Sequence, residues 1–160
     1  MFTPGNVVYA FCHNTTPPKN KYMISLYRGL DFDLVFSFTT SQPRAGVPEE
    51  KIHHGTIKND AGESISYVFE ANQEIGTTPE GNRFSFHKRT VVTFDYGIHQ
   101  TKLDALLRTI DNPEVKCKLD AQEYEDLIYA MMKSPRTPEK FKPIFDQILV
   151  SLFAAKKLGE

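Results

Sequence analysis

The 160-residue sequence contains no tryptophan and only two cysteines, Cys12 and Cys117. The cysteines are far apart and form no CxxC pattern. We interpret them as two buried free thiols in a reducing compartment rather than as a disulfide or a metal site. The bulky apolar side chains that a core needs come instead from twelve Phe and seven Tyr.

Long apolar runs are also lacking. No run approaches the roughly 20 residues that a membrane-spanning helix needs, and residues 1–5 lack the basic and apolar regions of a signal peptide. We predict a cytoplasmic protein with no membrane partner. The net charge of −1 provides no global attraction for nucleic acid, so a site for a polyanion has to be a local basic patch.

Known catalytic fingerprints are missing as well. The sequence has no P-loop, no GxGxxG, no GxSxG and no HExxH. Readings as a phosphate-cradling loop, a Rossmann domain or a zincin therefore have no support. We predict no cofactor and no metal ion.

The first part of the chain, about residues 4–97, has the pattern of short strands, rich in aromatic and β-branched residues. The expected strands are 7–11, 22–27, 33–39, 66–70, 83–86 and 90–94. Two long segments with Pro, Gly and Asn, residues 13–21 and 41–55, are expected to be loops. Long loops in a compact domain more often have a functional role than a purely connecting one.

From residue 98 the apolar spacing becomes that of helices. We expect these at 103–110, 120–133 and from about 141 to 157. The second helix is expected to start with a capping box, in which Asp120 caps and Glu123 reaches back. Pro143 is expected to begin or kink the third. Their apolar faces are expected to be core, or in part a surface for another chain.

These patterns predict one domain, residues 1–160, of an α+β, mainly β, class. Its body is a small SH3-like barrel or curled antiparallel sheet, and two or three C-terminal helices in the helical part at about 100–157 cover one side or end of it.

Basic side chains occur in three separate stretches and are the candidates for contact with phosphates. They are Lys19 and Lys21 at the first long loop, Arg44 in the second, and His87, Lys88 and Arg89 among aromatic residues. Nearby Phe and Tyr rings could stack on unpaired bases. The alternative is that the charges solvate the surface and the aromatics belong to the core.

Two further groups could take part in chemistry. Thr39, Thr40 and Ser41 end a strand and open a loop, where their hydroxyls could bind a phosphate or simply support a turn. His53 and His54 are adjacent and would point to opposite faces of a strand, so they are poorly placed to share a metal ion. They are either solvated loop residues, or one of them is an acid or base.

The first forty residues and a later segment resemble the MazF/PemK-like toxin family. Residues 4–9, PGNVVY, resemble the PGDIV opening strand of that family, and residues 21–26, KYMISL, are similar in placement to its RPxLVxS strand. The hydroxyl residues 39–41 match a Thr or Ser at the end of the third strand. Residues 94–107 and 119–123 are similar to a later strand, short helix and final helix entry. The helix after Thr137 is extra.

The resemblance implies an SH3-like barrel that dimerises, pairs with an antitoxin protein and cuts single-stranded RNA without a metal. Lys21 would stabilise the charge on phosphorus, Thr39 or Thr40 would contact the phosphate, and His54 or His87 could assist. Lys21 stands where the family usually has Arg, and a lysine lacks the bidentate fork of arginine.

We therefore expect a toxin-type endoribonuclease or a weakened descendant of one. The alternative is a non-catalytic module on the same barrel that binds nucleic acid or protein. A third hypothesis is a structural partner whose C-terminal helices dock onto another chain.

Overall fold

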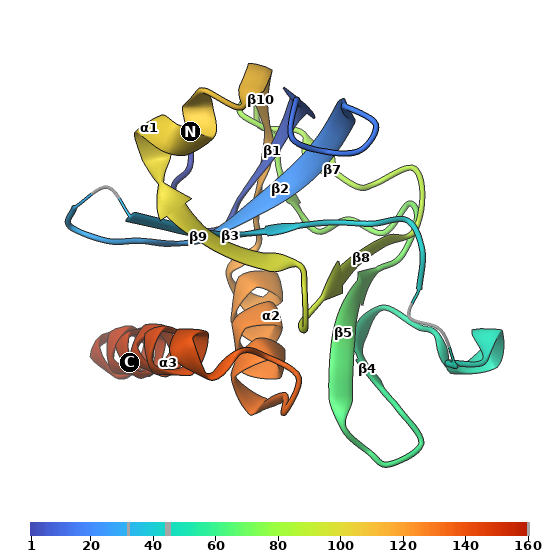
Figure 1. The fold of residues 1–160 in the computed structure, drawn as a ribbon. Coiled ribbons are helices and arrows are strands. Elements are labelled where there is room, and N and C mark those ends of the chain that lie inside the picture. The colour runs from blue at the N-terminus through green and yellow to red at the C-terminus, as the bar shows by residue number, and fades with distance from the viewer. Residues whose placement is uncertain (32, 44–45, 160) are drawn as a thin grey trace.

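The computed structural model describes residues 1–31, 33–43 and 46–159 (Figure 1). The strands of these residues are β1 (Asn6–Cys12), β2 (Lys19–Arg28), β3 (Asp33–Phe38), β4 (Gly55–Lys58), β5 (Ser64–Phe69), β6 (Gly76–Thr77), β7 (Arg83–Phe84), β8 (Thr90–Thr93), β9 (Ile98–Lys102) and β10 (Ile110–Leu119). The helices are α1 (Leu103–Leu107), α2 (Ala121–Lys133) and α3 (Lys142–Leu158), with short 3₁₀ turns η1 (Glu49–Lys51) and η2 (Glu139–Phe141). None of these helices is long and apolar enough to cross a membrane.

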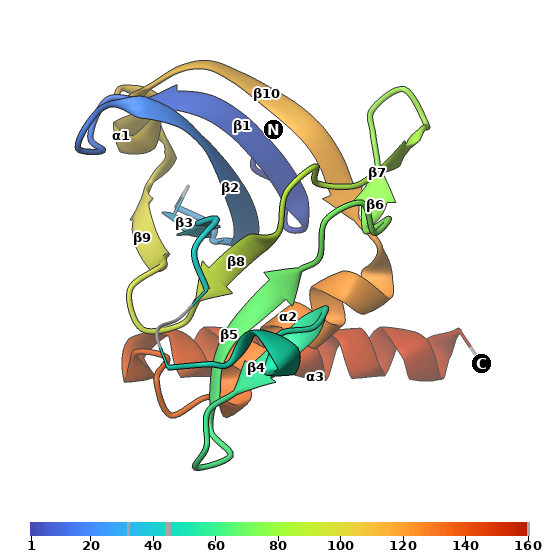
Figure 2. The same cartoon turned by 90° about the vertical axis from the view of Figure 1, so that its right-hand side faces the viewer.

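The strands form two antiparallel sheets. The larger has the order β7-β6-β10-β1-β2-β3-β9 and curls strongly, as Figure 2 shows for β10, β1 and β2. The smaller has the order β4-β5-β8. A single bridge between Thr40 and Val91 joins the end of β3 to β8. This bridge brings the two sheets together at one place.

The main core fills the space between the concave side of the large sheet, the small sheet and the helices α2 and α3. Alternate residues of β1 to β3 point into it, as the period of two in a strand requires. Its fully buried members include Val7, Ile24, Val35, Tyr67, Phe94, Leu127 and Phe145. A second, smaller core lies on the opposite face of the large sheet, where Phe2 and the α1 residue Leu106 cover Val8, Met23 and Phe36. Only part of that second face is covered.

The predicted class, α+β and mainly β with a curled antiparallel sheet, is confirmed. The prediction that the part at about 100–157 contains only helices is wrong, because it also contains the strand β10. The helix expected at 103–110 ends at Leu107, and the ten residues of β10 form a strand between β1 and β6. β10 was missed because its outward residues are charged, and because its pairing with the start of the chain is not a local property. The short strands β4, β6 and β9 were missed as well.

The predicted start of α2 is right, but the predicted capping box does not form. The Asp120 side chain makes no capping hydrogen bond. It accepts two hydrogen bonds from Arg83, at 2.9 and 2.5 Å. Glu123 turns toward His54 and Tyr67 instead of the helix start. Arg83 thus binds the Asp120 carboxylate, and His54 and Tyr67 bind the Glu123 carboxylate, so these contacts from distant segments replace the local capping box. α3 has Pro143 in its first turn, as expected.

The turn from β8 to β9 requires glycine at position 97. A Cβ atom there would lie 2.6 Å from the carbonyl oxygen of Thr93 and 3.1 Å from Oγ of Ser37. Because the nearest atom belongs to the backbone, it cannot swing away. We expect Gly97→Ala to lower the free energy of unfolding by about 2 kcal/mol, measured by urea denaturation. The control is Gly159→Ala, where the nearest atom is 3.5 Å away and the change should stay within about 0.5 kcal/mol. Equal effects of the two changes would contradict the tight turn.

Candidate functional site

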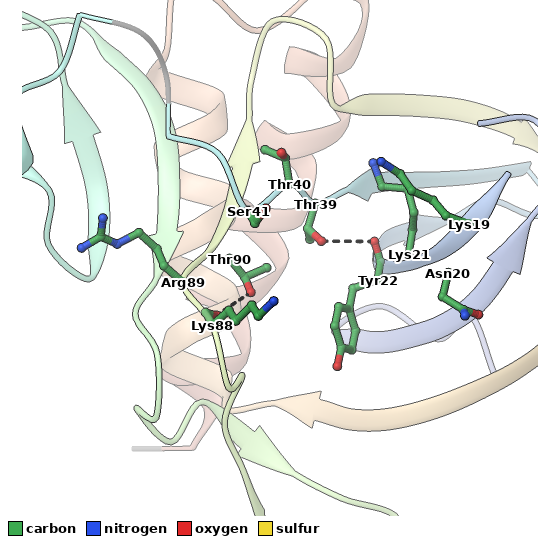
Figure 3. Close-up of a pocket in the computed structure, with 10 residues that line it drawn as sticks. All are labelled: Lys19, Asn20, Lys21, Tyr22, Thr39, Thr40, Ser41, Lys88, Arg89 and Thr90. Carbon is green, nitrogen blue, oxygen red and sulfur yellow. Dashed lines mark hydrogen bonds between the residues drawn. The ribbon is translucent and has the colours of Figure 1, made fainter. Parts of the chain in front are cut away.

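The start of β2, the end of β3 and the start of β8 enclose a pocket of about 250 Å³ (Figure 3). We call it the lysine pocket. It is lined by Lys19, Asn20, Lys21, Tyr22, Thr39, Thr40, Ser41, Lys88, Arg89 and Thr90. Of the three stretches that were predicted from sequence to act together, 19–21, 39–41 and 87–89, every residue except His87 lines this pocket.

Backbone pairing explains why these stretches meet. The N–H of Thr39 donates to the carbonyl of Tyr22 at 3.2 Å, which holds the end of β3 beside β2. Thr40 and Val91 then exchange two backbone hydrogen bonds of 2.9 and 2.7 Å. The bridge sets residues 88–90 across from Lys21. The pocket is thus built by the junction of the two sheets rather than by a loop.

The pocket concentrates positive charge without neutralising it. Figure 3 shows the ammonium groups of Lys19 and Lys21 close to one another, with Lys88 facing them from the other side. No lining residue is a carboxylate, and within the described ranges the ion-paired lysines are other ones. Burial, helped by the charge of Lys19, lowers the pKa of Lys21. The arrangement suits a phosphate, whose charge would relieve the repulsion.

Arg89 belongs to the lining but not to this set of free cations. Its guanidinium points away from the pocket in Figure 3. Nη1 is 2.8 Å from Glu49, and Nε donates to Glu70 at 2.9 Å. Those carboxylates already neutralise it. His87 is exposed and is not part of the lining. Arg44, the remaining basic candidate, lies outside the described residues.

His54 does not line the lysine pocket. Its Nδ1 accepts a hydrogen bond of 3.1 Å from the backbone N–H of Glu70. Nδ1 therefore carries no proton, and Nε2–H donates to the carboxylate of Glu123. With both nitrogens engaged in holding β4 and β5 to α2, His54 is a structural residue. His53 is exposed, and its Nδ1 bonds the carbonyl of His54.

The hydroxyl groups of the pocket are not equivalent. Thr39 is buried and donates to the carbonyl of Tyr22 at 3.4 Å, and Thr90 is buried and donates to the carbonyl of Lys88 at 3.0 Å. Thr40 is half-buried, and its oxygen accepts a 3.2 Å hydrogen bond from the N–H of Gln42. Its own proton is thus available to a ligand. Of the predicted hydroxyl residues, Thr40 and the exposed Ser41, which also lines the pocket, are therefore better placed than Thr39 to contact a phosphate.

Sequence reasoning missed His99, which lies beside the lysine pocket. A hollow of about 140 Å³ is lined by Lys21, Thr39 and Thr40 and also by Phe38 and His99. His99 is opposite Phe36 in the β3–β9 pairing and stacks on its ring at 5.6 Å between centroids. Its edge is exposed. Burial of the ring, then the charges of Lys140 and Lys21, lower the pKa of His99, so its imidazole is neutral at pH 7.

One signal in the sequence pointed at His99. The segment just before residue 103 does not have the apolar spacing of a helix. Its residues, Ile98, His99, Gln100, Thr101 and Lys102, are therefore also compatible with a strand. A strand places its residues alternately on two faces. Which face His99 would take depended on pairing with β3, and that pairing is not encoded locally.

No group of three or more His, Cys, Asp or Glu side chains in the described ranges is arranged to hold a metal ion. No protein-family model, curated protein or solved structure matches the chain. The similarity to MazF/PemK-like toxins accordingly stays a prediction from residues 4–9, 21–26, 39–41, 94–107 and 119–123.

Proposed function

We propose that the protein binds single-stranded RNA in the lysine pocket and cleaves it without a metal ion, as a MazF/PemK-like endoribonuclease. One observation carries this proposal: Lys19, Lys21 and Lys88 meet in a carboxylate-free pocket, beside the free hydroxyl of Thr40 and the neutral imidazole of His99. Phosphate contacts from lysines and hydroxyls are typical of nucleic-acid sites.

The chemistry that these groups support is attack of the RNA 2′-hydroxyl oxygen on the adjacent phosphorus. His99 accepts the 2′-hydroxyl proton, because a neutral imidazole is a competent base. Lys19 and Lys88 stabilise the negative charge that builds up on the phosphoryl oxygens. Lys21, whose pKa is lowered, donates a proton to the leaving 5′ oxygen as the P–O5′ bond breaks. The products are a 2′,3′-cyclic phosphate and a 5′-hydroxyl end.

The test is incubation of the purified protein with an unstructured RNA in EDTA. Wild type is expected to cut the RNA and to leave cyclic phosphate ends. Lys21→Ala should lower the cleavage rate at least about 100-fold, since it removes both a proton donor and a charge from the site. Lys133→Ala is the matched control, because Lys133 is exposed at the end of α2 and should leave the rate unchanged. An intact RNA with wild type, or equal rates for the two lysine variants, contradicts the proposal.

A non-catalytic binding module is the second candidate. The pairing of Arg89 with Glu49 and Glu70 favours it, because the pocket then has lysines alone and no bidentate phosphate ligand. Salt-dependent binding of the RNA without turnover would identify this function. Homodimerisation, an antitoxin partner and a cytoplasmic location stay predictions from the sequence.

A further inference from the structure

We propose that the hollow on the far side of His99 is a subsite for one unpaired nucleobase, and that it gives the site its base preference. The inference rests on the proposed RNA binding. It concerns the base of the RNA, because the lysine pocket would contact the phosphate only. The hollow has a volume of about 380 Å³ and lies between β3, β9, α1 and the loop after β1. We call it the aromatic pocket.

The aromatic pocket adjoins the hollow beside His99, and that hollow in turn adjoins the lysine pocket. Phe38 and His99 line both the aromatic pocket and the intermediate hollow, and Lys21 lines both the intermediate hollow and the lysine pocket. Strand pairing puts these groups on one face of the sheet: Met23 is opposite Phe38, and Phe36 is opposite His99. A phosphate held by Lys21 would therefore have a base of the same strand within reach of this pocket.

Aromatic rings form the side of the pocket that faces the lysines. Phe38 and His99 meet edge to face at 5.2 Å between centroids, and Phe38 also carries the ammonium of Lys21 at 5.4 Å from its ring centre. Phe38 is only half-buried, although it is large and apolar. A partly exposed ring next to a cationic pocket is the arrangement by which proteins stack an unpaired base while holding its backbone.

The rest of the pocket offers hydrogen-bonding groups suited to the edge of a base. The side-chain amide of Asn14 is exposed, and within the described residues it is not engaged in a hydrogen bond that would restrict it. Thr15 and Thr109 donate their protons to the backbone carbonyls of Cys12 and Leu106 at 3.1 and 2.8 Å. Their oxygens thus face a ligand as acceptors. Amides that both donate and accept can match a Watson–Crick edge.

The experiment measures binding of a six-nucleotide 2′-O-methyl RNA, which lacks the attacking hydroxyl and cannot be cut. Its affinity is compared, by fluorescence anisotropy over a salt series, with that of the same backbone made abasic. We expect wild type to bind the base-containing strand about tenfold more tightly than the abasic one. Phe38→Leu and Asn14→Ala should each reduce this ratio toward one, with the salt dependence unchanged.

Matched controls are Phe153→Leu and Gln147→Ala, an exposed ring and an exposed amide on α3, which should keep the wild-type ratio. If Phe38→Leu fails to fold, Asn14→Ala alone decides, because the Asn14 side chain is exposed. Salt-dependent binding with equal affinity for both strands overturns the base subsite and leaves the proposed phosphate binding standing. Absence of salt-dependent binding overturns the proposed function and the subsite together.

Discussion

Replacement of His99 by asparagine is expected to lower the rate of RNA cleavage by about 100-fold or more, while binding of an uncleavable RNA stays near the wild-type level. A general base contributes on the order of 10² to 10⁴ in rate. Asparagine keeps a polar group of similar size but cannot accept the proton. His53→Asn is the control, because His53 is exposed and lies outside the lysine pocket. A variant that loses binding as much as cleavage would make His99 a contact residue instead of a base.

The pH dependence provides a second readout that a structural role for His99 would not produce. Only the neutral imidazole accepts the 2′-hydroxyl proton, so the rate should rise with pH until His99 is deprotonated. Burial, then Lys140 and Lys21, lower the pKa of His99 below its usual 6.5. The midpoint of the acid limb should therefore lie below pH 6.5. Lys140→Gln removes one repelling charge and should move the midpoint upward, and His99→Asn should abolish that limb.

A midpoint above 6.5 in the wild type, or one that does not move in Lys140→Gln, would count against His99 as the base. The double substitution Lys140→Gln with His53→Asn serves as the internal check, since His53 should add nothing to the shift. The rates are best followed with a short fluorogenic RNA at constant ionic strength, because phosphate binding by lysines is itself sensitive to salt.

Part of this site was predictable from sequence because its residues stand in recognisable local sequence patterns. Lys19 and Lys21 stand in a predicted loop directly before a strand of clear β pattern, Thr40 stands at the end of another strand, and Lys88 stands in a basic cluster. Each stretch is recognisable by composition alone. That they meet depends on the Thr40–Val91 bridge, and the resemblance to a toxin family supplied the expectation that they would.

The errors have a common physical cause, which is partners that are remote in the sequence. Arg89 looked like a phosphate ligand, but Glu49 and Glu70 neutralise it. His54 looked like a candidate acid or base, but Glu123 and the Glu70 amide occupy both its nitrogens. The sequence of β10 resembles a polar connecting segment, but the segment is a strand because it pairs with β1 and β6. None of these contacts leaves a mark in the local pattern.

Replacement of Glu123 by alanine is expected to lower the free energy of unfolding by about 2 kcal/mol. The Glu123 carboxylate accepts hydrogen bonds from His54 Nε2–H and, at 3.2 Å, from the hydroxyl of Tyr67. Both the His54 and Glu123 side chains are more than four-fifths buried, and Tyr67 is only 2% exposed. Truncation would leave two buried donors without an acceptor. Water can reach this position only in part, so it restores little of the loss.

Urea denaturation of a double-mutant cycle distinguishes this network from the capping box that the sequence predicted. If Glu123 stabilised only the start of α2, the effects of Glu123→Ala and His54→Ala would add. If the two side chains bond each other, the double variant should cost less than the sum of the single ones by about 1 kcal/mol. Glu139→Ala, a highly exposed glutamate at 86%, should change stability by no more than about 0.5 kcal/mol. Additive effects in the cycle would place Glu123 back at the helix terminus and would free His54 from the structural role assigned above.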